Sequence, residues 1–150
     1  MTLADPRATL GFGDVEVGEV LPELVLPMTA TRIVAGAIAT RDFMPVHHDR
    51  GFANQQGAPE IFMNILSDTG YCSRFVTDWA GPEAAVRRLA IRLGVPAFAG
   101  STLTFSGTVI AAVLDGDEGR VDIALRASND LGDHIEGTIT IALPLRDQPR

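Results

Sequence analysis

The side chains best suited to chemistry in this sequence lie in one short stretch, DFMPVHHD at residues 42–49. It holds a carboxylate, Asp42, and an imidazole, His47, on either side of Pro45. Because proline disrupts a helix interior and pushes the preceding residue toward extended geometry, we expect a short irregular loop that brings both side chains into one small volume. Such a pair can hold and activate a water molecule: one group accepts a proton, and the other orients the water or returns the proton.

The same stretch could also be read as a metal site. Adjacent residues rarely converge on one ion, however, and the only further histidine is the distant His134. We therefore expect no metal. His48 is expected to face solvent or cap a turn, and Asp49 to cap the segment that starts at Arg50. His134 follows a polar turn within a predicted strand and is expected at the surface.

Two helices and a run of strands are predicted around this loop. Residues 33–40 are small and apolar and fit a short buried helix that ends just before Asp42. Residues 60–79 contain no proline and place apolar residues at helical spacing over a wide arc, which indicates a long helix covered on several sides. An extended segment is predicted at 21–31, and alternating residues predict strands at 85–93, 101–114, 121–127 and 134–143. This order predicts an α+β fold whose sheet wraps around the long helix.

Single residues on the long helix have simple expected roles. Cys72 lies between apolar neighbours and is expected to be a buried, inert thiol. Asp68 and Arg74 are expected to be charges on the helix surface.

Length and composition indicate one globular domain of 150 residues, with 1–10 and 146–150 as loose termini. No apolar run reaches the ~18 residues of a membrane span, so no membrane segment is expected. The N-terminus lacks the basic start and apolar core of a secretory signal, and the single cysteine excludes an intrachain disulfide. A cytoplasmic protein is therefore expected.

Charge excludes further classes of function. The formal net charge of −7 argues against a nucleic-acid partner, which would need a basic footprint. All 12 basic residues are arginine, and the lack of lysine excludes Schiff-base and pyridoxal chemistry and the lysine-containing phosphate loop. A local arginine patch can still hold a phosphate group on an acidic protein.

The order of the predicted elements, with residues 42–49 just ahead of the long helix, resembles the MaoC-like (R)-specific enoyl-CoA hydratases. The motif of that family reads roughly Gly-Asp-x-Asn-Pro-x-His-x-Asp, and the matching stretch here is RDFMPVHHD at residues 41–49. The resemblance spans residues 12–143 and implies the hotdog fold, a curved antiparallel sheet around one central helix. It also implies that Asp42 and His47 are the catalytic pair for adding water across the α,β double bond of an enoyl-CoA. No bound cofactor is then needed, because CoA is part of the substrate.

Two positions depart from the pattern of that family. The motif asparagine is Met44 here, so one hydrogen-bonding side chain is missing from the loop. The family often carries His-Gly-Met at the start of the central helix, where the glycine N–H polarises the thioester carbonyl, and Asn64 stands where that glycine would be. A backbone N–H at a helix N-terminus can still serve, so the resemblance implies an oxyanion-binding role for the Asn64 N–H.

A closer resemblance is to the small subunits of the heteromeric MaoC-like hydratases of actinobacterial steroid side-chain breakdown. The matching stretches are IFMNIL at 61–66, RFVTDWAGP at 74–82 and LAIRLG at 89–94. The resemblance implies a bulky steroid-type enoyl-CoA substrate. It also implies a second MaoC-like chain as partner, often with an extra acyl-CoA-binding domain, although a homodimer is the minimum expected, because a lone sheet leaves an apolar face and strand edges exposed.

Substrate-binding candidates follow from the resemblance. Ile61, Phe62 and Ile65 could line an acyl pocket, although such a strip is more often plain core. Arg88 and Arg92 are candidates for the CoA phosphates because guanidinium groups make bidentate phosphate contacts, although a solvated strand face fits them equally well.

Two rival functions remain open at this point. A hotdog thioesterase would need a carboxylate on the central helix, which Glu60 or Asp68 could supply. A non-catalytic hotdog scaffold subunit is favoured by the departures at Met44 and Asn64, and opposed by the presence of both Asp42 and His47.

Overall fold

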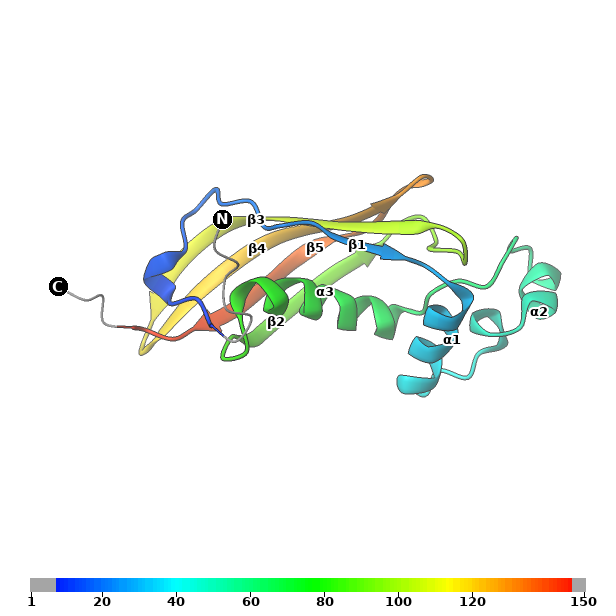
Figure 1. Ribbon diagram of the computed structural model, residues 1–150, viewed down its shortest axis with the longest axis horizontal. Helices are drawn as coiled ribbons and strands as arrows, with labels where there is room; N and C mark the ends of the chain where they lie inside the picture. Colours follow the sequence, from blue (N-terminus) through cyan, green and yellow to red (C-terminus); the bar gives the residue numbers. More distant parts are fainter. Residues whose placement is uncertain (1–7, 147–150) are drawn as a thin grey trace.

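The computed structural model describes residues 8–146 as a curved five-stranded antiparallel sheet with one long helix against its inner side (Figure 1). The strand order is β1-β3-β4-β5-β2. The strands are β1 (Leu24–Pro27), β2 (Ala85–Leu93), β3 (Thr102–Asp115), β4 (Glu118–Asn129) and β5 (Gly132–Leu143). The α+β arrangement predicted from the sequence is confirmed, with strand bounds that differ by only a few residues.

The helices other than the long one gather at one end of the sheet. α1 (Ala30–Ala39), the 3₁₀ turn η2 (Pro45–His47) and α2 (Arg50–Gln55) lie where the long helix α3 (Ile65–Ala80) begins (Figure 1). A further 3₁₀ turn, η1 (Phe12–Asp14), precedes β1. The short helix expected at 33–40 is α1, which starts earlier than predicted, at Ala30. It is also half exposed, because only Ile33 and Ala37 of α1 are buried.

The long helix begins at Ile65, later than the predicted residue 60. The preceding residues pair with the loop after β2: the Met63 N–H donates to the Ala97 carbonyl at 3.0 Å, and the Ile61 carbonyl accepts from the Ala99 N–H at 2.9 Å. Asn64 then caps the helix, because its side chain accepts the Ser67 N–H. Tertiary pairing thus prevails over the helical spacing of the apolar residues.

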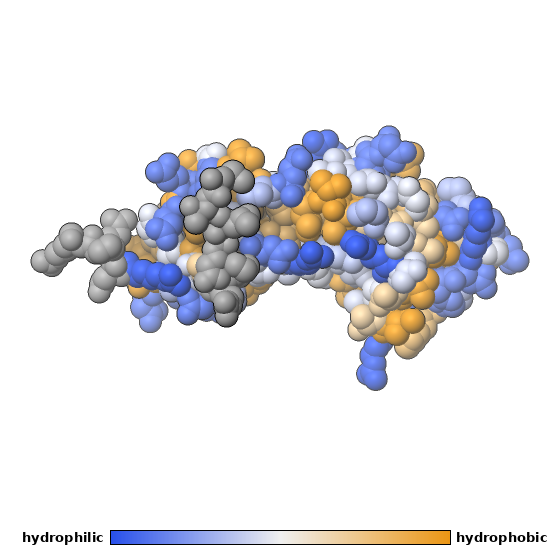
Figure 2. Space-filling model, in the orientation of Figure 1, coloured by the Kyte–Doolittle hydropathy of each residue, from blue (hydrophilic) through white to orange (hydrophobic). Residues whose placement is uncertain are grey.

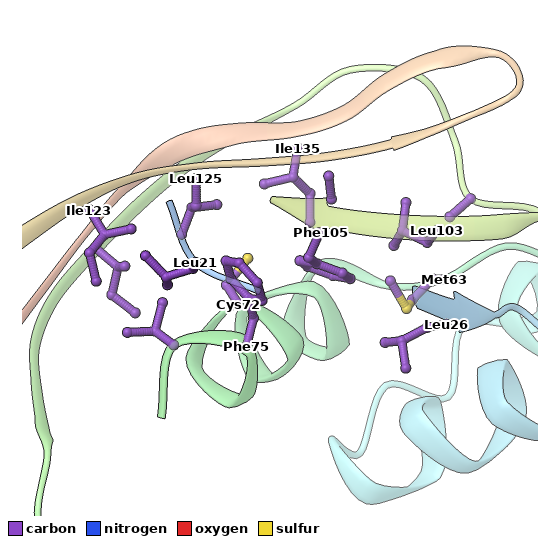
Figure 3. Packing of buried hydrophobic residues seen from close by; sticks show 14 of the residues in the cluster. Leu21, Leu26, Met63, Cys72, Phe75, Leu103, Phe105, Ile123, Leu125 and Ile135 are labelled. Atoms are coloured by element: carbon purple, nitrogen blue, oxygen red, sulfur yellow. The ribbon is translucent and has the colours of Figure 1, made fainter. Parts of the chain in front are cut away.

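The core lies between α3 and the inner face of the sheet. Figure 3 shows Cys72 and Phe75 of α3 directed at side chains from the strands, among them Phe105, Ile123 and Ile135. Alternate residues of β3 and β4 are buried, as their sequence alternation predicts. Gly107 leaves room for this packing, since a Cβ atom there would stand 3.0 Å from the Phe75 ring.

His134 and Asp68 form a buried pair, so the expectation that both lie at the surface is wrong. They are 2% and 0% exposed. His134 Nε2 lies 2.9 Å from Asp68 Oδ1, and Nδ1 lies 2.6 Å from the Val95 carbonyl oxygen. Both ring nitrogens therefore face acceptors, which suits an imidazolium that donates two hydrogen bonds. The pair ties α3 to β5 and to the loop after β2.

Part of each expected loose terminus is also packed. The Leu10 N–H donates to the Ala80 carbonyl at 2.8 Å, and Thr9 is buried and accepts the Glu83 N–H. Arg146 pairs with Glu83 at 2.7 Å. These contacts fasten both ends against the C-terminal end of α3, while residues 1–7 and 147–150 lie outside the described part.

Among residues 8–146, no helix has the length and apolar content needed to cross a membrane.

We predict that the His134–Asp68 pair makes stability depend on pH. Burial acts to lower the pKa of His134, but the hydrogen bond and charge of Asp68 outweigh it, and the pKa is raised above 6.5. The folded state therefore binds this proton more tightly than the unfolded state. The added stability is fully present below the unfolded pKa and is lost as the pH rises through the raised one. Urea unfolding across this pH range measures the free energy of unfolding. It should fall with rising pH in wild type and not in His134→Gln.

His134→Leu provides a second measurement. It leaves the Asp68 carboxylate buried without its partner, so we expect a loss of about 3–5 kcal/mol in the free energy of unfolding. A loss below about 1 kcal/mol would contradict a buried ion pair at this place.

Candidate active site

The end of α1 fixes the backbone of Asp42. The Arg41 N–H donates to the Ile38 carbonyl at 3.1 Å, and the Asp42 N–H donates to the Ala37 carbonyl at 2.9 Å. These two bonds make up a Schellman cap, in which the residue after the helix end adopts a left-handed conformation. Arg41 does so, with a φ of 58°. The Asp42 backbone is thus hydrogen-bonded to α1. The residue itself lies in the irregular loop that the proline at position 45 predicts.

His47 is fixed from the other side of the site. Pro45 starts the single turn η2, which ends at His47. The ring is buried and its Nδ1 lies 2.7 Å from the Phe62 carbonyl oxygen. Because a carbonyl only accepts, Nδ1 must carry a hydrogen, which leaves Nε2 of the neutral ring as an acceptor. The Phe62 ring meets the His47 ring edge to face at 5.1 Å.

The structure brings Asp42 and His47 together, as their spacing predicts. His47 Nε2 lies 3.4 Å from Asp42 Oδ2. The Asp42 side chain is 27% exposed and that of His47 9%, so the carboxylate faces the open side of the pair.

Asp42 also accepts two hydrogen bonds from neutral donors. Asn64 Nδ2 donates to Oδ2 at 3.0 Å, and the Met44 N–H donates to Oδ1 at 3.3 Å. The bond from Asn64 is the main cause that holds the pKa of Asp42 below its usual value, with smaller contributions from Met44 and His47 against the effect of burial. The Asp42 side chain is therefore a carboxylate near neutral pH.

The Asn64 side chain is the site residue that the sequence did not predict, since only its backbone N–H was assigned a role. Among the described residues, no acceptor is hydrogen-bonded to that N–H. Its side chain also donates to Thr40 Oγ1 at 2.9 Å, so it joins the end of α1 to the start of α3. The sequence did carry a signal: asparagine is a favoured N-cap residue, and a later helix start would have placed it there.

The three predicted acyl-lining residues have different surroundings. Ile61 is 4% exposed and belongs to the core, so it lies behind the site and not on its surface. Phe62 is half buried between the rings of His47 and Phe98. Ile65 is 51% exposed at the start of α3, next to the Asn64 cap, and is open to a ligand.

The two predicted phosphate-binding arginines lie on β2, at the edge of the sheet and away from the loop of Asp42. Arg92 is paired with Glu136 across β2 and β5. Arg88 is exposed, and no carboxylate among the described residues forms an ion pair with it. Of the two, Arg88 is the guanidinium that is free to bind an anion.

The remaining candidates have structural roles. Asp49 caps α2 through the Phe52 N–H, as predicted, and exposed His48 lies 3.2 Å from the Phe43 carbonyl oxygen. Cys72 is fully buried, and burial, with a contribution from the charge of Asp68, raises its pKa to about 12. The expected burial of the thiol is thus confirmed.

Neither carboxylate considered for a thioesterase is an accessible group on the central helix. Glu60 precedes α3 and pairs with Arg50 at 2.8 Å. Asp68 is buried with His134.

Comparison with known proteins gives a curated relative from Mycobacterium tuberculosis, the 3-oxo-4,17-pregnadiene-20-carboxyl-CoA hydratase beta subunit. It is 50% identical over 131 residues, which cover 87% of this chain and 97% of that protein. The crystal structure of the ChsH1-ChsH2 complex from Mycobacterium tuberculosis matches with a TM-score of 0.80 and 50% identity, over 85% of this chain and 98% of that chain. A solved MaoC-like dehydratase matches with a TM-score of 0.78 and 26% identity, over 93% of this chain and 43% of that one. No family model matches the chain.

The chain belongs to the MaoC-like hydratase family. The predicted family, the hotdog fold and membership in a family of hydratase enzymes are thereby confirmed. As a MaoC-like protein, the chain keeps the aspartate and histidine of the motif in contact, while its motif asparagine is replaced by Met44.

We predict opposite effects on stability for two substitutions at Arg41, which supports the Asp42 backbone. A left-handed conformation costs an ordinary residue about 1–2 kcal/mol and costs glycine almost nothing. Arg41→Gly should therefore raise the melting temperature, whereas the β-branched Arg41→Val should lower it. Equal melting temperatures for the two variants would contradict a left-handed residue at this position.

Proposed function

We propose that this chain is the hydratase subunit of a two-chain MaoC-like enzyme that adds water across the 2,3 double bond of an enoyl-CoA with a bulky, steroid-type acyl group. The observation that carries the proposal is the pairing of two acceptor atoms, Asp42 Oδ2 and His47 Nε2, at 3.4 Å, with the carboxylate partly exposed. A water molecule that donates one hydrogen to each atom would point a lone pair away from the protein, toward a substrate carbon.

The two groups would have different roles: His47 would transfer the proton, and Asp42 would hold the water and stabilise the charge. As the water oxygen bonds to C3, His47 Nε2 accepts one of its protons, because Nδ1 already carries a hydrogen bonded to Phe62. Asp42 remains ionised, holds the second hydrogen of the water and stabilises the imidazolium. The electron pair of the double bond moves to the thioester oxygen and then returns to C2, which takes the proton back from His47. The hydroxyl and the hydrogen of one water molecule are thus added, and both residues return to their initial states.

The thioester oxygen would gain negative charge at the start of α3. The Asn64 N–H carries no intramolecular hydrogen bond within the described residues, and it lies at the positive end of the helix dipole. A donor there would stabilise the enolate-like transition state.

A partner chain would cover apolar surface next to the site. Exposed side chains gather there from α1, the motif loop and α3, and Figure 2 shows apolar surface at the end of the molecule that carries α1. They are Ile38 (60% exposed), Phe43 (66%), Met44 (51%), Ile65 (51%) and Leu66 (49%). Gly70 adds to this argument: it costs the helix about 1 kcal/mol against alanine, and a Cβ atom there would meet no atom of this chain within 4 Å.

The edge strand β2 supports the same conclusion. It pairs with β5 along one side, and its nine residues form an edge of the sheet. A long exposed edge invites pairing with another chain. The M. tuberculosis relative is named a beta subunit. The solved structure that matches this chain at 50% identity is a complex of two proteins, ChsH1 and ChsH2. A second MaoC-like chain is therefore the proposed partner.

We expect Asp42→Asn and His47→Gln each to lower the hydration rate by at least about a hundredfold. Both variants keep the approximate size of the side chain. Asp42→Asn removes the negative charge that stabilises the imidazolium, and His47→Gln removes the proton acceptor. Loss of enoyl-thioester absorbance should be followed in the complex with the partner chain, on short, long and steroid-type 2-enoyl-CoAs.

His48→Gln and Asp49→Asn are the matched controls, because they make the same chemical changes in the same loop outside the pair. Both should keep wild-type rates. A fully active Asp42→Asn enzyme would rule out this mechanism, and free thiol release without hydration would favour a thioesterase.

The two arginines on β2 provide a separate test of CoA binding. Arg88→Glu should raise KM severalfold with kcat unchanged. A guanidinium that only binds phosphate stabilises the bound substrate and the transition state equally. Arg92→Glu should have a smaller effect, since Arg92 is already paired with Glu136. An unchanged KM in Arg88→Glu would remove this residue from the CoA site.

A further inference from the structure

We propose that Asn64 is a positioning residue whose side-chain amide holds the Asp42 carboxylate in the orientation that receives the water, an inference that rests on the proposed hydratase function. The first evidence is the geometry of the amide. Asn64 is 3% exposed, and its side chain forms three hydrogen bonds, two to the segment that ends α1 and one to the first turn of α3.

The orientation of the amide is determined by its neighbours. The Ser67 N–H can only donate, so the oxygen Oδ1 must face it, and their distance is 3.2 Å. Nδ2 then points the other way, at Thr40 Oγ1 (2.9 Å) and Asp42 Oδ2 (3.0 Å). An amide nitrogen has two hydrogens, and both are satisfied by this pair of acceptors.

Capping the helix alone would not require an asparagine. Serine or aspartate caps a helix equally well through one side-chain oxygen. A helix cap uses only the side-chain oxygen, so Nδ2 has no role in capping. Both hydrogen bonds from Nδ2 go to the segment that ends α1. Thr40 is itself held, since its hydroxyl donates to the Gly36 carbonyl at 2.8 Å, so its lone pairs are free to accept from Nδ2.

The consequence for Asp42 is a carboxylate fixed at both oxygens. The Met44 N–H holds Oδ1 from the loop, and Asn64 holds Oδ2 from the helix. Oδ2 is also the oxygen that faces His47 Nε2. Rotation of the carboxylate would break a bond from Asn64 and move Oδ2 away from the place of the water, so we expect loss of the amide to lower the rate without weakening substrate binding.

The test separates the amide from the cap and from the backbone. Asn64→Ser keeps the backbone N–H and a capping oxygen, and loses Nδ2. Asn64→Asp also keeps the cap, and places a second carboxylate beside Asp42. In the complex with the partner chain we expect kcat of Asn64→Ser to fall about ten- to a hundredfold, the range for a lost hydrogen bond to a charged group, with KM nearly unchanged.

The pKa of Asp42 provides a readout that a purely structural role would not change. Asn64 is the largest cause of the lowered pKa of Asp42. The pKa of Asp42 should therefore rise in Asn64→Ser, and further in Asn64→Asp, where a like charge opposes ionisation. Carboxyl carbon NMR titration of Asp42, assigned with Asp42→Asn, should show the same order of pKa values without any substrate.

Asn129 provides a matched control. Its Oδ1 accepts the Leu131 N–H at 2.9 Å and its Nδ2 donates to the Pro96 carbonyl at 3.0 Å, so it combines the same two roles without contact to Asp42. Asn129→Ser and Asn129→Asp should leave the pH profile and the titration of Asp42 unchanged.

The outcomes distinguish this inference from the proposed function. If no enoyl-CoA is hydrated but the Asp42 pKa rises in Asn64→Ser, the function is wrong and the positioning contact stands. If wild type hydrates and Asn64→Ser keeps its kcat and leaves the pKa of Asp42 unchanged, Asn64 is only a helix cap and the inference is overturned.

Discussion

Two helix ends meet at one asparagine side chain, and the candidate site depends on that junction. Asn64 caps the start of α3 and donates to Thr40 and Asp42 at the end of α1. The free carbonyl groups of a helix end carry partial negative charge, and the free N–H groups of a helix start carry partial positive charge. The amide oxygen of Asn64 accepts from a free N–H at the start of α3, and its nitrogen donates to the side-chain oxygens of Thr40 and Asp42 at the end of α1. No apolar residue could bring these two ends together without leaving buried polar groups unpaired.

The junction also explains how this chain departs from the motif of its family. The loop has Met44 in place of the asparagine, and the helix cap has Asn64 in place of the glycine. Taken separately, each change removes a feature expected of a catalytic member, which is what favoured the scaffold alternative. The geometry links them, because the amide at 64 bonds to the Asp42 carboxylate while Met44 still contributes its backbone N–H. The amide donor is present, but it comes from the helix instead of the loop.

Much of the fold and the central pair could be predicted from the sequence, because those signals are local. Strand alternation and the proline between Asp42 and His47 depend on a few neighbouring residues. The misplaced start of α3 has another cause: residues 61–63 fit a helical pattern, but they pair with residues 97–99, which no local pattern reveals. His134 and Asp68 were missed for the same reason. They are 66 positions apart, and each looks like a surface residue until the other is placed beside it.

The placement of that second pair shows how stability and chemistry are separated in this chain. Both regions contain an aspartate and a histidine, yet the environments differ. His134 and Asp68 are sealed in the core, with both ring nitrogens bonded, so His134 has no ring nitrogen left to accept a proton from a ligand. His47 has one ring nitrogen bonded to Phe62, which leaves Nε2 facing a partly exposed carboxylate. A general base needs an unoccupied acceptor within reach of substrate. The free Nε2, and not the mere presence of the residue types, is therefore the reason for proposing Asp42 and His47 as the reactive pair.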